Sequence, residues 1–279
     1  MSVHEEYDSM FKIYQPFFKN HTVGFEQQMV FAPAQMRFYH FYMPKSYLGK
    51  YEFTCIPDGC ADMVFVYDEG DYKVEFIGSP LSKKVLTCYP GSRYFGVRLK
   101  PGMFFDLDDI SLADVTNHEI IYASRDLNVG AFVERLQKQE FLSEKIDLFL
   151  SEFSASLTDT YLEGPVRGII ENINASKGCI TVSKLAENLC YSERQVRRLL
   201  DANMNISPKT LCRIVRFQNA LHRMIRNPDL GNTQYIADLD YADQAHFQRE
   251  FKEFTGLPPQ EFRRRYKRTL GRPQTAFHV

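Results

Sequence analysis

The spacing of hydrophobic residues changes along the chain from a strand-like to a helix-like period. Between residues 23 and 100, short runs rich in Phe, Tyr and Val are separated by Pro, Gly and Asp. These runs predict strands at 36–43, 51–56, 63–67, 72–77, 84–89 and 94–99. Because a single open sheet of this length would leave both faces poorly covered, the pattern favours a small closed barrel.

After residue 102 the apolar residues recur every three or four positions, which is typical of amphipathic helices. We expect helices at 111–117, with Ser111 as N-cap, at 130–139 and at 140–157. Such helices either cover the open end of a barrel or form a dimer, and the sequence does not choose between them. Residues 158–165 are the expected linker, so residues 1–157 form the first predicted domain.

The second half contains an internal repeat with an offset of about fifty residues. The aligned pairs are Ala186 and Ala237, Val196 and Phe247, Arg198 and Arg249, Leu200 and Phe251, Asn205 and Gly256, and Pro208 and Pro259. Each copy predicts two short helices joined by a tight turn, a helix-turn-helix. Further helices are expected at 165–175, at 208–226 between the copies and at 259–268, with a tail at 269–279.

The net charge of −1 conceals two oppositely charged halves. Residues 1–164 hold 15 Lys and Arg against 24 Asp and Glu, a net −9, and residues 165–279 hold 19 against 11, a net +8. A basic segment with two helix-turn-helix units favours double-stranded DNA as its partner. The fold class expected for the whole chain is therefore α+β, with a β-rich N-terminal domain and an all-α C-terminal domain.

Other features narrow the class of protein. The chain has no apolar run long enough for a transmembrane helix, and its N-terminus lacks the features of a secretory signal. The six cysteines are scattered, which favours a reducing cytoplasm over a disulfide framework. No Ser-His-Asp, Walker or dinucleotide pattern is present, so we expect no enzyme and no cofactor.

Residues 166–268 resemble the DNA-binding region of AraC-type transcriptional regulators. The resemblance rests on S-E-R-Q-V-R-R-L-L in the first copy and on Y-A-D-Q-A-H-F-Q-R-E-F-K-E-F-T-G-L-P-P-Q-E-F-R-R-R-Y in the second. The N-terminal strings I-P-D-G-C-A-D-M-V-F and F-G-V-R-L-K-P-G are similar to a sensor-type domain that precedes this region in some members. The resemblance implies a cupin-like barrel with a small-molecule effector, followed by the DNA-binding domain.

Two positions depart from the pattern of the family. The turn of each helix-turn-helix commonly has Gly, but here the positions hold Cys190 and Asp240. Asp adopts positive φ more readily than most residues, and Cys does not. In the second copy, alignment from Tyr241 places Ile236 where a small residue is usual, whereas alignment on Ala237 leaves the turn one residue short.

The second helix of each copy supplies the residues that we expect to contact DNA. In the first copy these are Arg194, Arg197 and Arg198 on the outward face, beside Ser192 and Gln195 at the start of the helix. In the second copy they are Gln244, His246, Gln248 and Arg249, with Asp243 as the cap. Lys209, Arg213 and Arg263 are expected phosphate contacts. A solvated basic surface is the alternative for every one of these positions.

The N-terminal domain gives weaker indications of a functional site. The residues His40, Cys55, Asp58, Cys60 and Asp62 raise the possibility of a metal site, but they lack the usual ligand spacing, so we expect none. A thiol sensor formed by Cys55, Cys60 and Cys88 is a minor alternative, because buried thiols are inert. The effector pocket implied by the resemblance would be lined by aromatic residues, namely Phe38, Phe41, Phe65, Tyr67 and Phe95, which could equally be core.

The function expected from these features is an effector-responsive regulator that binds specific DNA and recruits or blocks RNA polymerase, acting as a homodimer away from membranes. Two alternatives remain open at this point. One is a constitutive DNA-binding regulator whose N-terminal domain only dimerises. The other is a cupin-like metal enzyme fused to a DNA-binding module. The sequence names neither the effector nor the operator.

Overall fold

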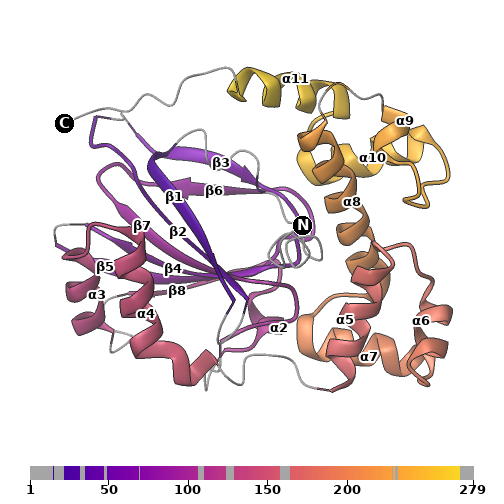
Figure 1. Ribbon diagram of the computed structural model, residues 1–279, viewed down its shortest axis with the longest axis horizontal. Helices are drawn as coiled ribbons and strands as arrows, with labels where there is room; N and C mark the ends of the chain where they lie inside the picture. The colour runs from indigo at the N-terminus through magenta and orange to yellow at the C-terminus, as the bar shows by residue number, and fades with distance from the viewer. Residues whose placement is uncertain are drawn as a thin grey trace.

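A computed structural model describes residues 15, 22–31, 35–46, 49–68, 70–105, 110–123, 129–157, 164–227, 229 and 232–270 (Figure 1). Residues 158–163 of the expected linker and residues 271–279 of the expected tail lie outside these ranges. Within the described residues, no helix combines the length and the apolar character that a membrane span requires.

In the described residues of the N-terminal half, eight strands form two antiparallel sheets. The larger sheet has the order β1-β2-β7-β4-β5-β8 and the smaller one pairs β3 with β6. The strands are β1 (Val23–Val30), β2 (Met36–Tyr42), β3 (Tyr51–Cys55), β4 (Ala61–Tyr67), β5 (Tyr72–Ile77), β6 (Lys84–Cys88), β7 (Arg93–Leu99) and β8 (Glu119–Ala123). The six predicted strands are confirmed. The other two, β1 and β8, were not among them, although β1 lies within the range 23–100 that was predicted to be strand-like.

The prediction of a closed barrel is wrong. Among the described residues, β1 and β8 are the two edges of the six-stranded sheet and do not pair with each other. Closure is not needed to cover the sheet, because helices lie on one face and the β3–β6 pair lies over the other (Figure 1). The physical reasoning about exposed faces was sound, but separate layers meet that requirement.

The helix layer is formed by α3 (Gly130–Gln137) and α4 (Leu142–Leu157), and the short α2 (Leu112–Val115) precedes it. Ser111 caps α2 through a reciprocal capping box with Asp114, as the sequence predicted. The core on this face is aromatic. Phe149 of α4 packs edge-on against Phe38 at 5.5 Å and against Phe65 at 6.3 Å between ring centroids.

The C-terminal half is entirely helical in its described part. Its helices are α5 (Pro165–Ala175), α6 (Val182–Asn188), α7 (Glu193–Met204), α8 (Pro208–Arg226), α9 (Asn232–Tyr235), α10 (Gln244–Thr255) and α11 (Pro259–Leu270). Side chains of Ser192 and Asp243 cap α7 and α10, and the left-handed Asn205 and Gly256 end them. The predicted helix-turn-helix pairs are therefore α6–α7 and α9–α10, with α8 as the rod between them (Figure 1).

Candidate nucleic-acid interface and ligand pocket

Both turns keep the backbone conformation that Gly usually provides. Cys190 has φ 56° and Asp240 has φ 48°, so both residues are left-handed. In the first turn the backbone N–H of Tyr191 donates to the carbonyl of Ala186 at 2.9 Å. The fold therefore imposes this conformation on Cys190, a residue type that rarely adopts it.

The second turn has two left-handed residues, Asp238 and Asp240, and Asp240 matches Cys190 because a tyrosine follows each of them. Cys190 corresponds to Asp240, which makes Ile236 the counterpart of the buried Ala186. The alignment of Ala186 with Ala237 is wrong, because Ala237 is exposed whereas Ile236 is partly buried against the core. The additional residue of the second copy, Ala242, lies between the turn and the cap of α10.

The first recognition helix, α7, buries Val196 and Leu200 and exposes its arginines. Arg197 forms an ion pair with Glu193 one turn earlier, at 2.7 Å. Arg194 and Arg198 are exposed and form no ion pair with any described residue. Two of the three predicted arginines are thus available for a partner, and the third is held along the helix.

Ser192 and Gln195, also predicted to contact DNA, are engaged with each other at the start of α7. The Ser192 hydroxyl accepts from the backbone N–H of Gln195 at 3.2 Å, and Oε1 of Gln195 accepts from the backbone N–H of Ser192 at 2.8 Å. This reciprocal box satisfies two backbone donors that the helix would leave unpaired. The structure therefore gives both residues a role in ending the turn and starting the helix.

The second recognition helix, α10, buries Phe247 and exposes Gln244, Gln248 and Arg249. Asp243 caps it, as predicted, by accepting from the backbone N–H of His246 at 2.6 Å. The predicted contact His246 is half-buried, because its ring packs edge-on against Tyr241 with the centroids 5.4 Å apart. Arg249 forms no ion pair within the described part of the chain, and its place matches that of Arg198 in α7.

A buried carboxylate fixes α10 to the rod α8. Glu250 is 2% exposed and lies 2.8 Å from Arg213 Nε and 3.4 Å from Arg216. The Tyr241 hydroxyl donates to the same carboxylate at 2.8 Å, and the Arg216 guanidinium lies 4.6 Å from the Tyr241 ring. Burial, followed by the charge of Glu250, raises the pKa of Tyr241 and keeps its proton in place.

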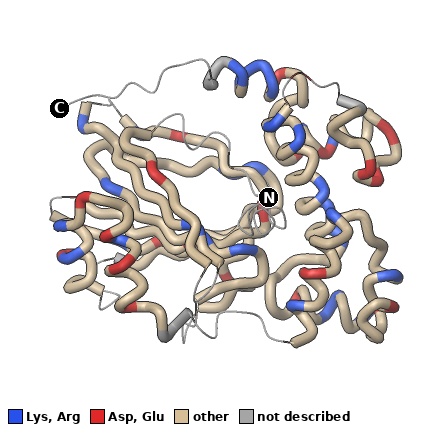
Figure 2. The backbone as a smooth tube through the Cα atoms, in the orientation of Figure 1, with Lys and Arg blue, Asp and Glu red and all other residues tan. Residues whose placement is uncertain are grey.

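The three residues predicted to contact phosphates occupy different environments. Arg213 forms ion pairs with Glu250 and with Glu253, the second at 2.7 Å. Lys209 is exposed in the first turn of α8, and Arg263 is half-buried on α11. Figure 2 shows Lys and Arg positions concentrated along α8 and α11, whereas both signs alternate over the N-terminal half.

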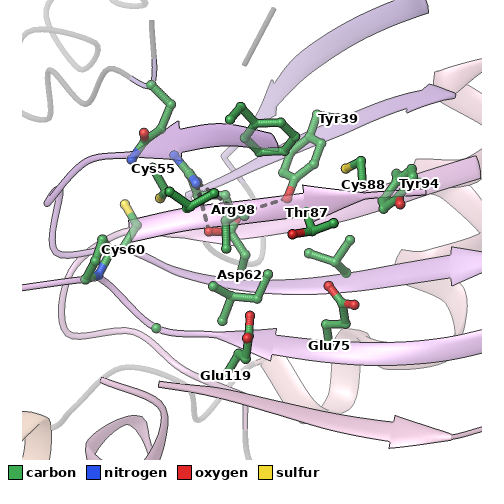
Figure 3. Close-up of a pocket in the computed structure, with 18 of the residues that line it drawn as sticks. Tyr39, Cys55, Cys60, Asp62, Glu75, Thr87, Cys88, Tyr94, Arg98 and Glu119 are labelled. Atoms are coloured by element: carbon green, nitrogen blue, oxygen red, sulfur yellow. Dashed lines mark hydrogen bonds and ion pairs between the residues drawn. The ribbon is translucent and has the colours of Figure 1, made fainter. Parts of the chain in front are cut away.

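A cavity of about 170 Å³ lies between the two sheets of the N-terminal half (Figure 3). At one end, Arg98 donates to Asp62 through Nε at 3.0 Å and through Nη2 at 2.9 Å, and to Asp58 through Nη1 at 3.0 Å. The Tyr39 hydroxyl donates to Asp62 at 3.1 Å. Burial raises the pKa of Asp62, and the contacts with Arg98 oppose that rise.

Two further residues define this end of the cavity. Gly96 lies beneath the ring of Tyr39, where a Cβ atom would come within 2.0 Å of the ring carbon Cζ, so only Gly leaves room for it. Gln15 reaches in from the N-terminal part of the chain, and its amide donates to Asp58 at 2.8 Å and to the Ile56 carbonyl at 2.7 Å.

The structure separates the aromatic residues that were expected to line a pocket. Phe41 lines the cavity, whereas Phe38, Phe65, Tyr67 and Phe95 point to the opposite face of the sheet and belong to the helix-covered core. The reason is the two-residue period of the strands, which sends alternate side chains to opposite faces. The pocket residues Glu75, Tyr94 and Arg98 were not identified from the sequence, and Asp62 was considered only as a possible metal ligand. The alternation of these residues with the core residues was a usable signal.

Cys55, Cys60 and Cys88 all line the same cavity. Burial raises the pKa of the Cys88 thiol to about 12, and it raises those of Cys55 and Cys60 as well. A thiol with a raised pKa holds little of the thiolate that reacts with oxidants. In the described part of the chain, no group of three or more His, Cys, Asp or Glu side chains is arranged to hold a metal ion.

Comparison with known families supports the reading of the helical half. A protein-family model described as a helix-turn-helix domain matches residues 185–265. A second family model, described as a domain of unknown function (DUF6597), matches residues 36–121. The C-terminal region is an AraC-type helix-turn-helix domain. This AraC-type domain makes the chain a DNA-binding transcription regulator.

Among curated proteins no match is found, but solved structures provide similar chains. An apo form of a ToxT variant from Vibrio cholerae is 12% identical with a TM-score of 0.47, covering 82% of this chain and 96% of that one. The C-terminal domain of AraT, a response regulator from Geobacillus stearothermophilus, is 25% identical with a TM-score of 0.34, covering 37% of this chain and 86% of that one. A probable AraC family transcriptional regulator from Rhodopseudomonas palustris is 25% identical with a TM-score of 0.32, covering 36% and 95%.

Among the described residues, the AraC-type domain touches the N-terminal half through the rod and through both helix-turn-helix units. Gln218 of α8 is 4% exposed and donates to the carbonyl of Pro57 at 2.7 Å. Helix α2 packs against α7, the first recognition helix. The Lys83 side chain lies beside Gly256, which ends α10. Both helix-turn-helix units and the rod therefore have their own contact with the N-terminal half (Figure 1).

Proposed function

We propose that this regulator reads a specific DNA sequence with both recognition helices of one chain, and that a small molecule in the cavity of the N-terminal half controls it. The helices α7 and α10 would enter successive major grooves on one face of the DNA. The regulator would recruit or block RNA polymerase, and a homodimer would bind a pair of such sites.

The observation that supports sequence-specific DNA binding is the set of arginines without ion pairs on the two capped helices, α7 and α10. Arg194, Arg198 and Arg249 are exposed and have no carboxylate partner among the described residues. An arginine of this kind can donate two hydrogen bonds to the O6 and N7 atoms of guanine, with about 1–3 kcal/mol of discrimination. Gln244 and Gln248 are exposed as well, and their amides suit adenine.

The length of the rod sets the spacing between the two recognition helices. Helix α8 has 19 residues, which corresponds to a length of about 28 Å at 1.5 Å per residue. Successive major grooves on one face are about 34 Å apart. The difference is small enough for a modest bend in the DNA to close it, so we expect the intervening base pairs to favour bending.

Support for control by a ligand comes from the residues that join the cavity to the AraC-type domain. The loop after β3 holds Asp58, which pairs with Arg98 in the cavity, and Pro57, which accepts from Gln218 of α8. The Ser79 hydroxyl, also at the cavity, accepts from the backbone N–H of Gly59 at 2.8 Å, and its carbonyl accepts from Asn117 just after α2. A ligand that shifts this loop would therefore move Pro57, which contacts α8, and would reach α7 through Ser79, Asn117 and α2.

The test is selection of bound fragments from random DNA by the purified full chain, followed by titration of the selected site with variants. Arg194→Ala and Arg249→Ala should each lose about 1–3 kcal/mol of discrimination, at separate positions about one helical turn apart. Arg135→Ala, which removes the same charge from α3 of the N-terminal half, is the matched control and should leave the preference unchanged.

Three results would contradict the proposal. Binding without sequence preference, unaffected by both variants, would reduce the AraC-type domain to a nonspecific anchor. Loss of preference at one position only would leave a single reading helix. Specific binding that no small molecule alters, in titrations or in thermal stability, would favour a constitutive regulator whose N-terminal half serves another purpose.

A further inference from the structure

The floor of the cavity is an ordered grid of side chains on the inner face of the six-stranded sheet. The strand register places Arg98, Asp62, Ile77 and Glu119 in one cross-strand row. The next row holds Tyr39, Gly96, Val64, Glu75 and Ile121, and the third holds Phe41, Tyr94, Val66 and Lys73. Directly opposed residues in such rows have Cβ atoms about 4.5–5.5 Å apart. Acidic and aromatic groups thus face one small space.

The charges that line this space do not cancel. The carboxylates are Asp58, Asp62, Glu75 and Glu119, and the cations are Arg98 and Lys73. Lys84 does not line the cavity, but its Nζ lies 3.7 Å from a carboxylate oxygen of Glu119 and offsets the charge of that residue. One negative charge remains in excess even with Lys84 included. In a space partly enclosed by protein, an unbalanced charge attracts a ligand of the opposite sign more strongly than it would at the open surface.

The two cations in the lining are already occupied. Arg98 directs Nε and both terminal nitrogens at Asp62 and Asp58, and Lys73 lies 2.6 Å from one oxygen of Glu75. An anionic ligand would have to break one of these pairs to find a partner. The other carboxylate oxygen of Glu75 has no hydrogen-bond partner in the described part of the chain, and the Glu75 side chain is 16% exposed. A donor brought by a ligand could bind there without breaking a contact.

Aromatic rings enclose the same space. Phe41 of β2 and Phe53 of β3 line the cavity. Tyr39 and Tyr94 line it as well (Figure 3). Phe41 and Tyr94 stack on each other with centroids 4.5 Å apart and an interplanar angle of 6°. The faces of such rings attract ammonium groups, including those whose methyl groups leave no hydrogen to donate. An ammonium group that reaches the face of one of these rings would gain this attraction in addition to that of the carboxylates.

We propose that the cavity binds a small organic cation, with its ammonium group beside Glu75 and its carbon atoms against the aromatic rings. The volume of about 170 Å³ sets the size of the ligand, since a cavity of about 150 Å³ accepts benzene. That this cation is the effector rests on the function proposed above, whereas its binding does not depend on DNA.

Three probes of nearly equal shape test the charge preference directly. Choline carries a quaternary ammonium, 3,3-dimethyl-1-butanol replaces the nitrogen by carbon, and 3,3-dimethylbutanoate carries a negative charge. Calorimetric titration of the full chain without DNA should detect choline at least about tenfold more tightly than the neutral alcohol, a difference of about 1.4 kcal/mol. Equal binding of choline and the alcohol, tighter binding of the carboxylate, or no binding of choline would overturn the proposal.

A matched pair of variants tests the place of the ammonium group. Glu75→Gln keeps the shape of the side chain and removes its charge, and it should weaken choline binding about tenfold or more. Glu52→Gln makes the same change at an exposed position of β3 outside the cavity and should leave the affinity unchanged. An unchanged affinity in Glu75→Gln would place the cation elsewhere and contradict the proposal. Near-ultraviolet circular dichroism of each variant checks that the fold is intact.

The failures of the two proposals can be told apart. If choline binds in the cavity and DNA affinity does not change with choline present, the ligand class stands and effector control fails. If specific DNA binding is observed and choline does not bind, the ligand class fails and the regulator stands. DNA affinity is measured by fluorescence anisotropy on the selected site, with and without choline, so each answer comes from its own readout.

Discussion

The two helix-turn-helix units of this chain both bury apolar side chains of their recognition helix, but the second unit adds a buried ion pair. In the first unit, α7 is fixed by buried apolar residues, Val196 and Leu200, and by its packing against α2 of the N-terminal half. In the second unit, α9 has only four residues, and α10 buries Phe247, Phe251 and Phe254. It also buries the carboxylate of Glu250, which pairs with Arg213 and Arg216.

The comparison teaches that one repeated motif can be stabilised in two ways with different sensitivities. Apolar packing is tolerant of small shifts, because it depends on area and shape and not on direction. A buried ion pair is directional, and removal of one partner leaves a charge without compensation. We therefore expect the second recognition helix to be the more easily displaced by a single substitution.

The substitution expected to have the largest effect is Glu250→Ala. It leaves Arg213 and Arg216 without their shared buried partner, and the free energy of unfolding should fall by about 3–5 kcal/mol. Urea denaturation of the full chain measures the loss. Glu253→Ala is the control, because Glu253 pairs with the same arginine from a position that is 50% exposed, and it should cost less than about 1 kcal/mol. Similar losses in both variants would mean that burial does not distinguish the two pairs.

A smaller effect is expected at the helix caps. Asp243→Ala removes a charged acceptor from the start of α10 and should cost about 1–2 kcal/mol, since the charge also interacts favourably with the helix dipole. Ser192→Ala should cost about 1 kcal/mol or less, because Gln195 still accepts from the backbone N–H of residue 192. Thermal unfolding of both variants compares them, and a larger loss in Ser192→Ala would show that the reciprocal box outweighs the charged cap.

The smallest effect is a gain in stability at the first turn. Cys190→Gly relieves a left-handed conformation that costs a non-Gly residue about 1–2 kcal/mol, and the added freedom of Gly in the unfolded chain removes part of this gain. We expect a net increase of about 0.5–1 kcal/mol in denaturation experiments. Asp240→Gly in the second turn should gain less, because Asp tolerates this conformation better. A loss of stability in Cys190→Gly would indicate that the Cys190 side chain contributes a stabilising contact.

Much of the secondary structure could be predicted because it is encoded locally. The rod was predicted at 208–226 and is found at Pro208–Arg226, since its apolar stripe lies between a Ser-Pro start and an Asn stop. The caps Ser111 and Asp243 were equally evident from their side chains and positions. The strand β8 was missed, because its five residues follow a short helix and carry no turn residues that would mark them as a strand.

The candidate sites depended more on contacts between distant residues. The outward arginines of α7 were identified from helical spacing alone, but that spacing could not show that Arg197 is paired while Arg194 and Arg198 are not. Arg213 was expected to contact a DNA phosphate, but its side chain forms an ion pair with Glu250, which lies 37 positions later in the sequence. No local pattern contains such a pair.

By itself, the sequence determined the repeated unit, the rod between its copies and the excess of basic residues in the helical half, because each of these depends on composition and on spacing within one element. Only the tertiary structure decided which face of each strand lines the cavity, that the sheet stays open and that Glu250 is buried. The physical reason is that the two-residue period of a strand defines two faces without saying which one a helix will cover. That choice is made when segments far apart in the chain pack against one another.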